Sequence, residues 1–131
     1  MNLFRGEIYY ITFPYTFDRN FPHGKKKFVL VLQEGDYFKE YDTITVLLIT
    51  SDQEAKDYDT NVTIEVGTTK LTAESYIICA QPYTIRKELF RQKGVWCAGT
   101  LLPKVMDEVD TCLYLGLCMG SQNELPKVSV N

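Results

Sequence analysis

The amino-acid sequence predicts a small, strand-rich α+β domain in which a strongly curved antiparallel sheet, or half-open barrel, packs against one C-terminal helix. Aromatic and β-branched residues dominate the first two thirds of the chain, and prolines and glycines divide them into segments of strand length. Helical periodicity is clear only near the C-terminus. The 131 residues are the usual size of one domain, so we expect a single domain at 1–120 and a polar tail at 121–131.

The strands are predicted from alternating or compact apolar segments. Residues 14–25 contain two prolines, an aspartate, an asparagine and a glycine, which indicates a long loop after the first strand. Pro82 indicates that the last strand ends at a bulge or a sheet edge, because proline cannot donate a hydrogen bond to a neighbouring strand. The five predicted strands are 6–13, 27–33, 43–50, 61–66 and 75–85.

Residues 101–120 are predicted to form a helix that lies on the sheet and closes the core. Pro103 is tolerated in its first turn, where a backbone N–H has no helical partner. Charged residues take the face opposite the apolar one. The apolar face recurs at steps of three and four residues, at Leu102, Val105, Met106, Val109, Leu113 and Gly116.

Composition excludes several classes of protein. With 45% hydrophobic and 24% charged residues, the chain has the composition of a soluble globular protein. Its longest apolar run, ITVLLI, is too short to span a membrane, and the N-terminus lacks the apolar stretch of a secretory signal. We therefore expect a cytoplasmic protein without a membrane partner. The net charge of −3 argues against coating of duplex nucleic acid by bulk charge, but not against a local basic site.

The cysteines and the histidine give no sign of a metal or redox site. None of the four cysteines forms a CxxC pair, so we expect thiols in the core rather than disulfides or metal ligands. The single histidine, His23, has no cysteine at a metal-ligand spacing. The sequence also lacks a nucleotide-binding glycine loop, a GxSxG motif and an HExxH motif. We expect neither a metal nor another cofactor.

Two polar features could carry chemistry. Lys25, Lys26 and Lys27 come directly before the apolar run 28–33, and Thr50 and Ser51 directly follow the strand 43–50. Hydroxyls and backbone N–H groups at a strand end suit phosphate oxygens, and a lysine opposite them would stabilise charge on phosphorus. The residue types alone are equally those of turn-forming hydroxyls and a solvated lysine cluster.

The order of several motifs along the chain gives further evidence on the role of these lysines and hydroxyls. RGEIYYITFPY is followed by a glycine-containing loop, a lysine before FVLVLQ, then TVLLITS, AQPYTI, a glycine, and a helix ending in LGL. This order resembles the PemK/MazF family of toxin endoribonucleases over about residues 3 to 118. The resemblance implies an SH3-like small barrel of antiparallel strands with a C-terminal helix, the fold also shared by CcdB-type toxins.

The resemblance also implies an activity and partners. The expected reaction is sequence-selective, metal-independent cleavage of single-stranded RNA, in which the 2′-hydroxyl attacks the adjacent phosphate and leaves a 2′,3′-cyclic phosphate and a 5′-hydroxyl. The expected partners are a second copy of the chain, in a two-fold homodimer, and a cognate antitoxin whose disordered segment folds across the RNA grooves.

The resemblance assigns roles to particular residues. Lys27 takes the position of the family's catalytic arginine, with Phe28 in place of the following proline, and Thr50 matches the catalytic threonine. Tyr83 stands where the family has an arginine, and Ala80 where some members have an aspartate. The residues expected to bind RNA are Ser51, Lys25, Lys26, Gln81, Tyr83, Thr84, Arg86 and His23, with Lys87 beside them.

A second interpretation keeps the fold but not the catalysis. A non-catalytic module, CcdB-like or regulatory, would act by binding a protein or DNA partner. A third interpretation is a structural domain whose lysines are only solvated. The retained hydroxyls at Thr50 and Ser51, with a cation at Lys27, favour the ribonuclease, because a protein-binding module has no need of groups that face a phosphate.

Overall fold

The computed structural model of the chain describes residues 2–15, 19–34 and 38–120. Within these residues, seven antiparallel strands form one sheet in which the path β4-β5-β3-β2-β1-β7 is continuous and β6 pairs with β3. The sheet is followed by the helix α2 (Pro103–Gly116). The strands are β1 (Glu7–Phe13), β2 (Lys25–Val31), β3 (Thr43–Thr50), β4 (Asn61–Ile64), β5 (Ser75–Ile78), β6 (Tyr83–Arg86) and β7 (Trp96–Thr100), and two 3-10 helices are η1 (Gln53–Asp57) and η2 (Lys87–Arg91).

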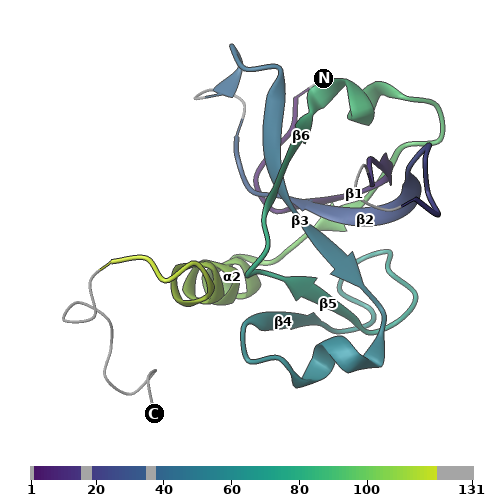
Figure 1. Ribbon diagram of the computed structural model, residues 1–131. Coiled ribbons are helices and arrows are strands. Elements are labelled where there is room, and N and C mark those ends of the chain that lie inside the picture. The colour runs from purple at the N-terminus through teal and green to yellow at the C-terminus, as the bar shows by residue number, and fades with distance from the viewer. Residues whose placement is uncertain (1, 16–18, 35–37, 121–131) are drawn as a thin grey trace.

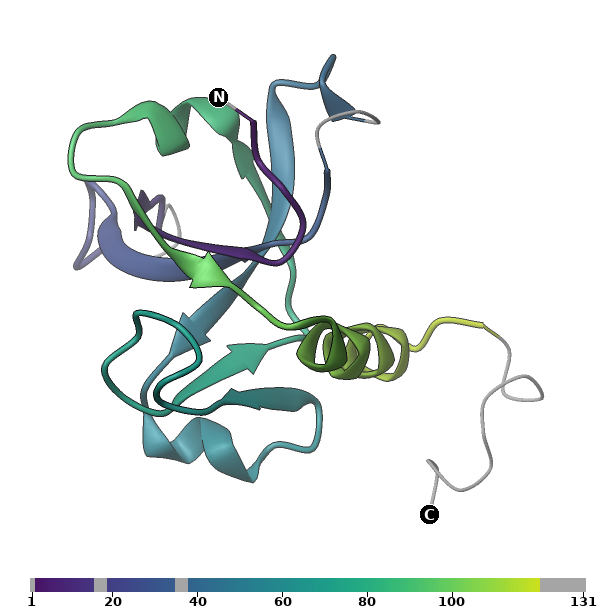
Figure 2. The same cartoon turned by 180° about the vertical axis from the view of Figure 1, so that it is seen from behind.

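Strand β3 connects the two halves of the sheet. One of its edges pairs with β2, and its other edge pairs first with β6 and then, at Ile49 and Thr50, with β5. Figure 1 shows β3 running from beside β6 in the upper half of the molecule to beside β5 in the lower half. Figure 2 shows from behind how this path curls the sheet around its interior. The predicted α+β fold, a curled antiparallel sheet with a C-terminal helix, is confirmed.

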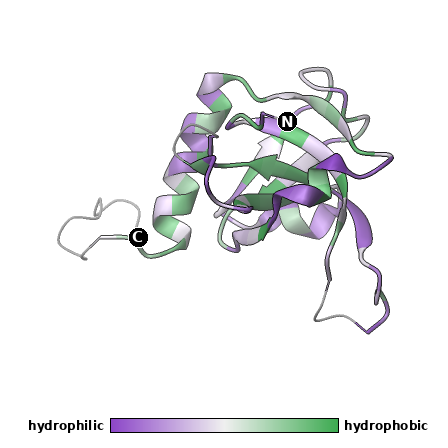
Figure 3. Cartoon of the chain, turned by 90° about the horizontal axis from the view of Figure 1, so that it is seen from above, coloured by the Kyte–Doolittle hydropathy of each residue, from purple (hydrophilic) through white to green (hydrophobic). Residues whose placement is uncertain are grey.

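Two hydrophobic clusters fill the two faces of the sheet. One contains Ile8, Leu30 and Leu47, and the other contains residues such as Val29 and Val46, in agreement with the alternation of side chains along a strand. Each fully buried side chain of this size contributes roughly 1.5–3 kcal/mol to folding. Figure 3 shows hydrophobic residues gathered in the central strands and alternating with hydrophilic residues along the helix.

Helix α2 is shorter than the predicted 101–120, but Pro103 lies in its first turn as predicted, and the helix buries Met106 and Val109 against the first cluster. Leu102 is not on its apolar face: it is the residue before the helix and is exposed, because the chain is still extended there. At the other end, a Cβ on Gly116 would lie 3.1 Å from the Cβ of Ala80, so this glycine lets the helix approach the sheet closely.

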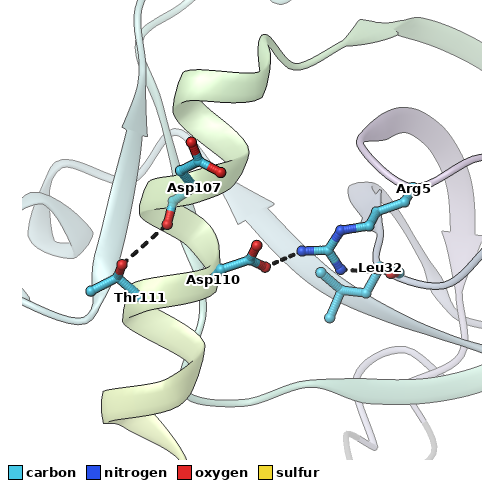
Figure 4. A network of polar contacts seen from close by, with 5 residues as sticks. All are labelled: Arg5, Leu32, Asp107, Asp110 and Thr111. Atoms are coloured by element: carbon cyan, nitrogen blue, oxygen red, sulfur yellow. Dashed lines mark hydrogen bonds and ion pairs between the residues drawn. The ribbon is translucent and has the colours of Figure 1, made fainter.

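Arg5 joins the helix to the sheet. Its guanidinium donates to the carbonyl oxygen of Leu32 at 2.8 Å and forms an ion pair with Asp110 of α2 (Figure 4). The same figure shows Thr111 donating to the carbonyl oxygen of Asp107, one turn back along the helix. The arginine therefore links the residue after β2 to the outer face of α2.

Several sequence predictions are corrected by the structure. Residues 75–85 form two strands rather than one, because β5 and β6 pair with different parts of β3. The strand predicted at 27–33 begins two residues earlier, so Lys25 and Lys26 lie inside β2 with Lys27, because Lys25 to Lys27 pair with β1. Strand β7 was not predicted. The polar tail at 121–131 lies outside the described residues, and among the described ones no helix is long and apolar enough to cross a membrane.

The hydroxyl of Tyr76 provides a test of the core. Tyr76 is fully buried in β5, and its hydroxyl has no hydrogen-bond partner among the residues that the structure describes. An unsatisfied buried hydroxyl costs about 1–3 kcal/mol. We therefore expect Tyr76→Phe to leave the free energy of unfolding unchanged or to raise it by about 1 kcal/mol in urea denaturation. A clear loss of stability would show that the hydroxyl is bonded.

Candidate functional site

Lys27 and Thr50 lie side by side at one end of β2 and β3. The two strands pair so that Phe28 is opposite Ile49. One further step of this antiparallel register places Lys27 opposite Thr50, on the same face of the sheet. Both side chains are half-buried, and both line two adjoining hollows. The register thus brings together the two residues that the resemblance assigns to catalysis.

The first hollow, which we call the aromatic hollow, has a volume of about 360 Å³. Besides Lys27 and Thr50, it is lined by Lys26 and Ser51, which the sequence also singled out. It combines cations and hydroxyls with an apolar wall. The residues that sequence reasoning missed there include Tyr10, Phe28, Trp96, Lys70, Thr72 and Ser75.

The second hollow, which we call the polar hollow, has a volume of about 400 Å³ and lies on the other side of Lys27 and Thr50. Gln81 is the predicted site residue that lines it. The rest of the lining comes from η1, β4 and the segments beside them. It includes amides, carboxylates and a phenol, so the polar hollow is rich in hydrogen-bonding groups. Those that the sequence did not single out include Asp52, Glu54, Tyr58 and Asn61.

The environment of Lys27 lowers the pKa of its ammonium group below the ordinary lysine value. Partial burial is the main cause, and the charge of Lys25 acts in the same direction. The carboxylate of Asp52 opposes both by favouring the charged form. Lys27 is therefore a partly desolvated cation, whose attraction to an anion is less screened by water than that of an exposed lysine.

Thr50 is oriented by the turn that follows it. Its hydroxyl oxygen accepts the backbone N–H of Asp52 at 3.1 Å, and the Asp52 carboxylate accepts the backbone N–H of Glu54 at 3.0 Å, which caps η1. The bond to Asp52 uses one acceptor position of the Thr50 hydroxyl and not its hydrogen. The hydroxyl can therefore donate to a group beside Lys27.

The β6 residues lie away from this pair. Arg86 is opposite Thr43, at the other end of β3 from Thr50, and a rise of about 3.4 Å per residue separates these positions by on the order of 20 Å. Arg86 forms an ion pair with Glu88 at 2.7 Å. Thr84 shares a hydrogen bond with Thr45 at 3.0 Å.

Tyr83 and Lys87 also make contacts away from Lys27. The Tyr83 ring packs edge-on against Phe13, with centroids 5.1 Å apart, and Lys87 donates to the carbonyl oxygen of Phe38. Neither residue lines the two hollows, in contrast to Gln81.

Lys25 and His23 flank the start of β2. The Lys25 ammonium lies over the Phe21 ring, 4.7 Å from its centroid, and His23 is exposed in the preceding loop. Gly24, with a φ of +87°, allows this loop to meet β1: a Cβ there would lie 2.6 Å from the carbonyl oxygen of Phe13. In the described parts of the chain, no group of three or more His, Cys, Asp or Glu side chains is arranged to hold a metal ion.

Comparison with protein-family models places the chain in a known family. Residues 4–117 match the model of the PemK-like, MazF-like toxin of type II toxin–antitoxin system. The chain belongs to this family. Among curated proteins, no sequence matches it.

Solved structures of PemK-like and MazF-like toxins share the fold at low sequence identity. An endoribonuclease in complex with its cognate antitoxin from a mycobacterial species is 17% identical, with a TM-score of 0.68 over 91% of this chain and 98% of that chain. A MazE–MazF complex from Deinococcus radiodurans is 17% identical, with a TM-score of 0.69 over 92% and 99%. The toxin MazF-mt6 from Mycobacterium tuberculosis is 17% identical, with a TM-score of 0.66 over 88% and 99%.

The electrostatics of Lys27 can be tested directly. We expect NMR titration of its side chain to give a pKa below the ordinary lysine value. Asp52→Asn should lower that pKa further, because it removes the opposing carboxylate while asparagine still caps η1. Lys25→Gln should raise it, because it removes a like charge. Shifts of the same sign in the two variants would contradict this arrangement.

Proposed function

We propose that this protein is the toxin endoribonuclease of a toxin–antitoxin pair and cleaves single-stranded RNA in the cytoplasm. The observation that carries the proposal is the pair of Lys27 and Thr50, a partly desolvated cation beside an oriented hydroxyl, between two hollows. The pair lies on the fold of a toxin family, among whose solved structures are proteins described as endoribonucleases. A groove that continues on both sides of the reacting phosphate suits an extended RNA strand.

The proposed reaction is an internal transfer within the RNA. The 2′-oxygen attacks the adjacent phosphorus and forms a new O–P bond, while the bond from phosphorus to the 5′-oxygen breaks. A base takes the proton of the 2′-hydroxyl, and an acid protonates the 5′-oxygen that leaves. The products are a 2′,3′-cyclic phosphate and a 5′-hydroxyl, and the reaction consumes no metal or co-reactant.

Lys27 and Thr50 act on the phosphate in this proposal. The Lys27 ammonium stabilises the negative charge that builds on the non-bridging oxygens, and its partial burial strengthens this effect. The Thr50 hydroxyl, held by the Asp52 N–H, donates to one of those oxygens. Ser51 and Lys26 extend the contacts on one side and Gln81 on the other.

The proposed partners are an antitoxin and a second copy of the chain. A cognate antitoxin with an acidic, partly apolar segment would cover the lysines of the aromatic hollow and so compete with RNA. We also propose that the chain forms a two-fold homodimer, as the resemblance to the family implies.

Cleavage by site variants tests the function. We expect the wild-type protein, in the presence of a chelator, to cut a long unstructured RNA at discrete positions and leave 5′-hydroxyl ends. Lys27→Ala and Thr50→Ala should each lower the rate by about a hundredfold or more, because each removes a group that stabilises the transition state. Neither should lower the melting temperature by more than a few degrees, because both side chains are only half-buried and lie at the margin of the core.

Arg86→Ala is the matched control. Like Lys27→Ala, it removes a cation from a strand of the sheet, but Arg86 is exposed and lies at the opposite end of β3. We expect it to cleave RNA at close to the wild-type rate. A loss as large as that of Lys27→Ala would place the site elsewhere, and a folded wild-type protein that makes no cuts would favour a non-catalytic binding module.

A further inference from the structure

Tyr10, Phe28 and Trp96 form an aromatic row across three neighbouring strands. Phe28 in β2 and Trp96 in β7 are the cross-strand partners of Tyr10 in β1, so the three side chains leave the same face of the sheet. Ring centroids are 4.7 Å apart for Tyr10 and Phe28, 5.9 Å for Tyr10 and Trp96, and 5.6 Å for Phe28 and Trp96. These are contact distances for aromatic pairs, so each ring holds the next in place.

Trp96 is the exposed end of the aromatic row. The residue is 42% exposed, whereas Tyr10 and Phe28 are half-buried. The Phe28 ring meets the indole at 89°, edge to face, and so supports it without covering all of its surface. A large ring that is already held by its neighbours can bind a second ring with little loss of conformational entropy.

Lysines surround the aromatic row. The Lys26 ammonium lies 5.8 Å from the centre of the Tyr10 ring, and Lys27 and Lys70 line the same hollow. Gly94 leaves room for Lys26, since a Cβ there would lie 3.4 Å from its Nζ. An exposed indole flanked by cations matches single-stranded nucleic acid, whose bases stack while its phosphates pair with cations.

We propose that Trp96 stacks on the unpaired base next to the phosphate that Lys27 and Thr50 bind. This inference rests on the proposed function, because it assigns a base subsite to the same RNA site. Trp96 and the pair of Lys27 and Thr50 all line the aromatic hollow. The stacked base and the reacting phosphate therefore belong to neighbouring nucleotides of one RNA strand. Stacking involves the face of a base and not its hydrogen-bonding edge, so this subsite anchors RNA with little selectivity among the four bases.

Fluorescence gives the first test, because Trp96 is the only tryptophan in the chain. We would titrate the wild-type protein with a short 2′-O-methylated RNA, which cannot be cleaved by 2′-hydroxyl attack. We expect the tryptophan emission to change and to saturate with the same Kd as the anisotropy of a labelled copy of that RNA. An emission that stays constant while the anisotropy saturates would overturn the proposal.

Removal of single bases gives the second test. A set of RNAs, each with one abasic nucleotide, would be bound to the wild type and to Trp96→Ala. We expect Trp96→Ala to weaken binding of the intact RNA by about tenfold, and Trp96→Phe by much less, because phenylalanine still stacks. Removing the stacked base should weaken binding to the wild type but not further weaken binding to Trp96→Ala. Additive losses at every position would overturn the proposal.

Two controls separate this inference from the proposed function and from misfolding. Thermal melting of Trp96→Ala and Trp96→Phe checks the fold, and Trp96→Phe keeps the test valid if the alanine variant is unstable. A wild type that cleaves RNA but shows only additive losses would refute the base subsite alone. A folded wild type that neither binds nor cleaves RNA would refute both.

Discussion

The register of β2 against β3 is the constraint on which the rest of the site depends. Because side chains alternate, a slip of one residue would turn Lys27 away from Thr50 and move Val29 and Leu30 into each other's cluster. Both faces of the sheet are buried at these strands, so such a slip would disrupt packing on both sides at once. The hydrophobic core thus fixes the positions of two polar residues that lie at its margin and contribute little to it.

The same alternation gives the site its two unlike sides. Lys26 and Phe28 lie on the face of β2 that carries the aromatic row, whereas Lys27 lies on the opposite face, with Thr50. The end of the two strands is therefore a boundary between an apolar, cationic hollow and a hollow rich in amides and carboxylates. In the proposed function, RNA crosses this boundary at the reacting phosphate, so that one side supplies stacking and the other side supplies groups able to read base edges.

The sequence could predict those parts that depend on local pattern. The apolar runs of β1 and β3 and the periodicity of α2 were sufficient to predict these three elements, because each pattern is long relative to its repeat. Strand β7 is not predicted because Ala98 and Gly99 weaken its pattern and its partner, β1, lies far away in the sequence. The sequence predicts the start of β2 at Lys27 and not at Lys25, since charge is uncommon inside a strand unless a neighbour such as β1 continues beside it. Trp96 carries no local sign of its role, because the row exists only through pairing across three strands.

Lysine at position 27 changes how the proposed site must hold its substrate. An arginine, which the resemblance places here, offers a planar fork that contacts a phosphate at two points, whereas lysine offers a single flexible charge. Lys26 and Lys70, the other cations of the aromatic hollow, are also point charges, so the cations alone fix the charge of the substrate but not its orientation. Orientation must then come from groups with fixed geometry. Such groups in the described site include the Thr50 hydroxyl, held by the turn at Asp52, and the indole of Trp96, held by the rings beside it. In the proposed function, a stacked base on one side and an oriented hydroxyl at the phosphate together supply the alignment that a second arginine contact would give.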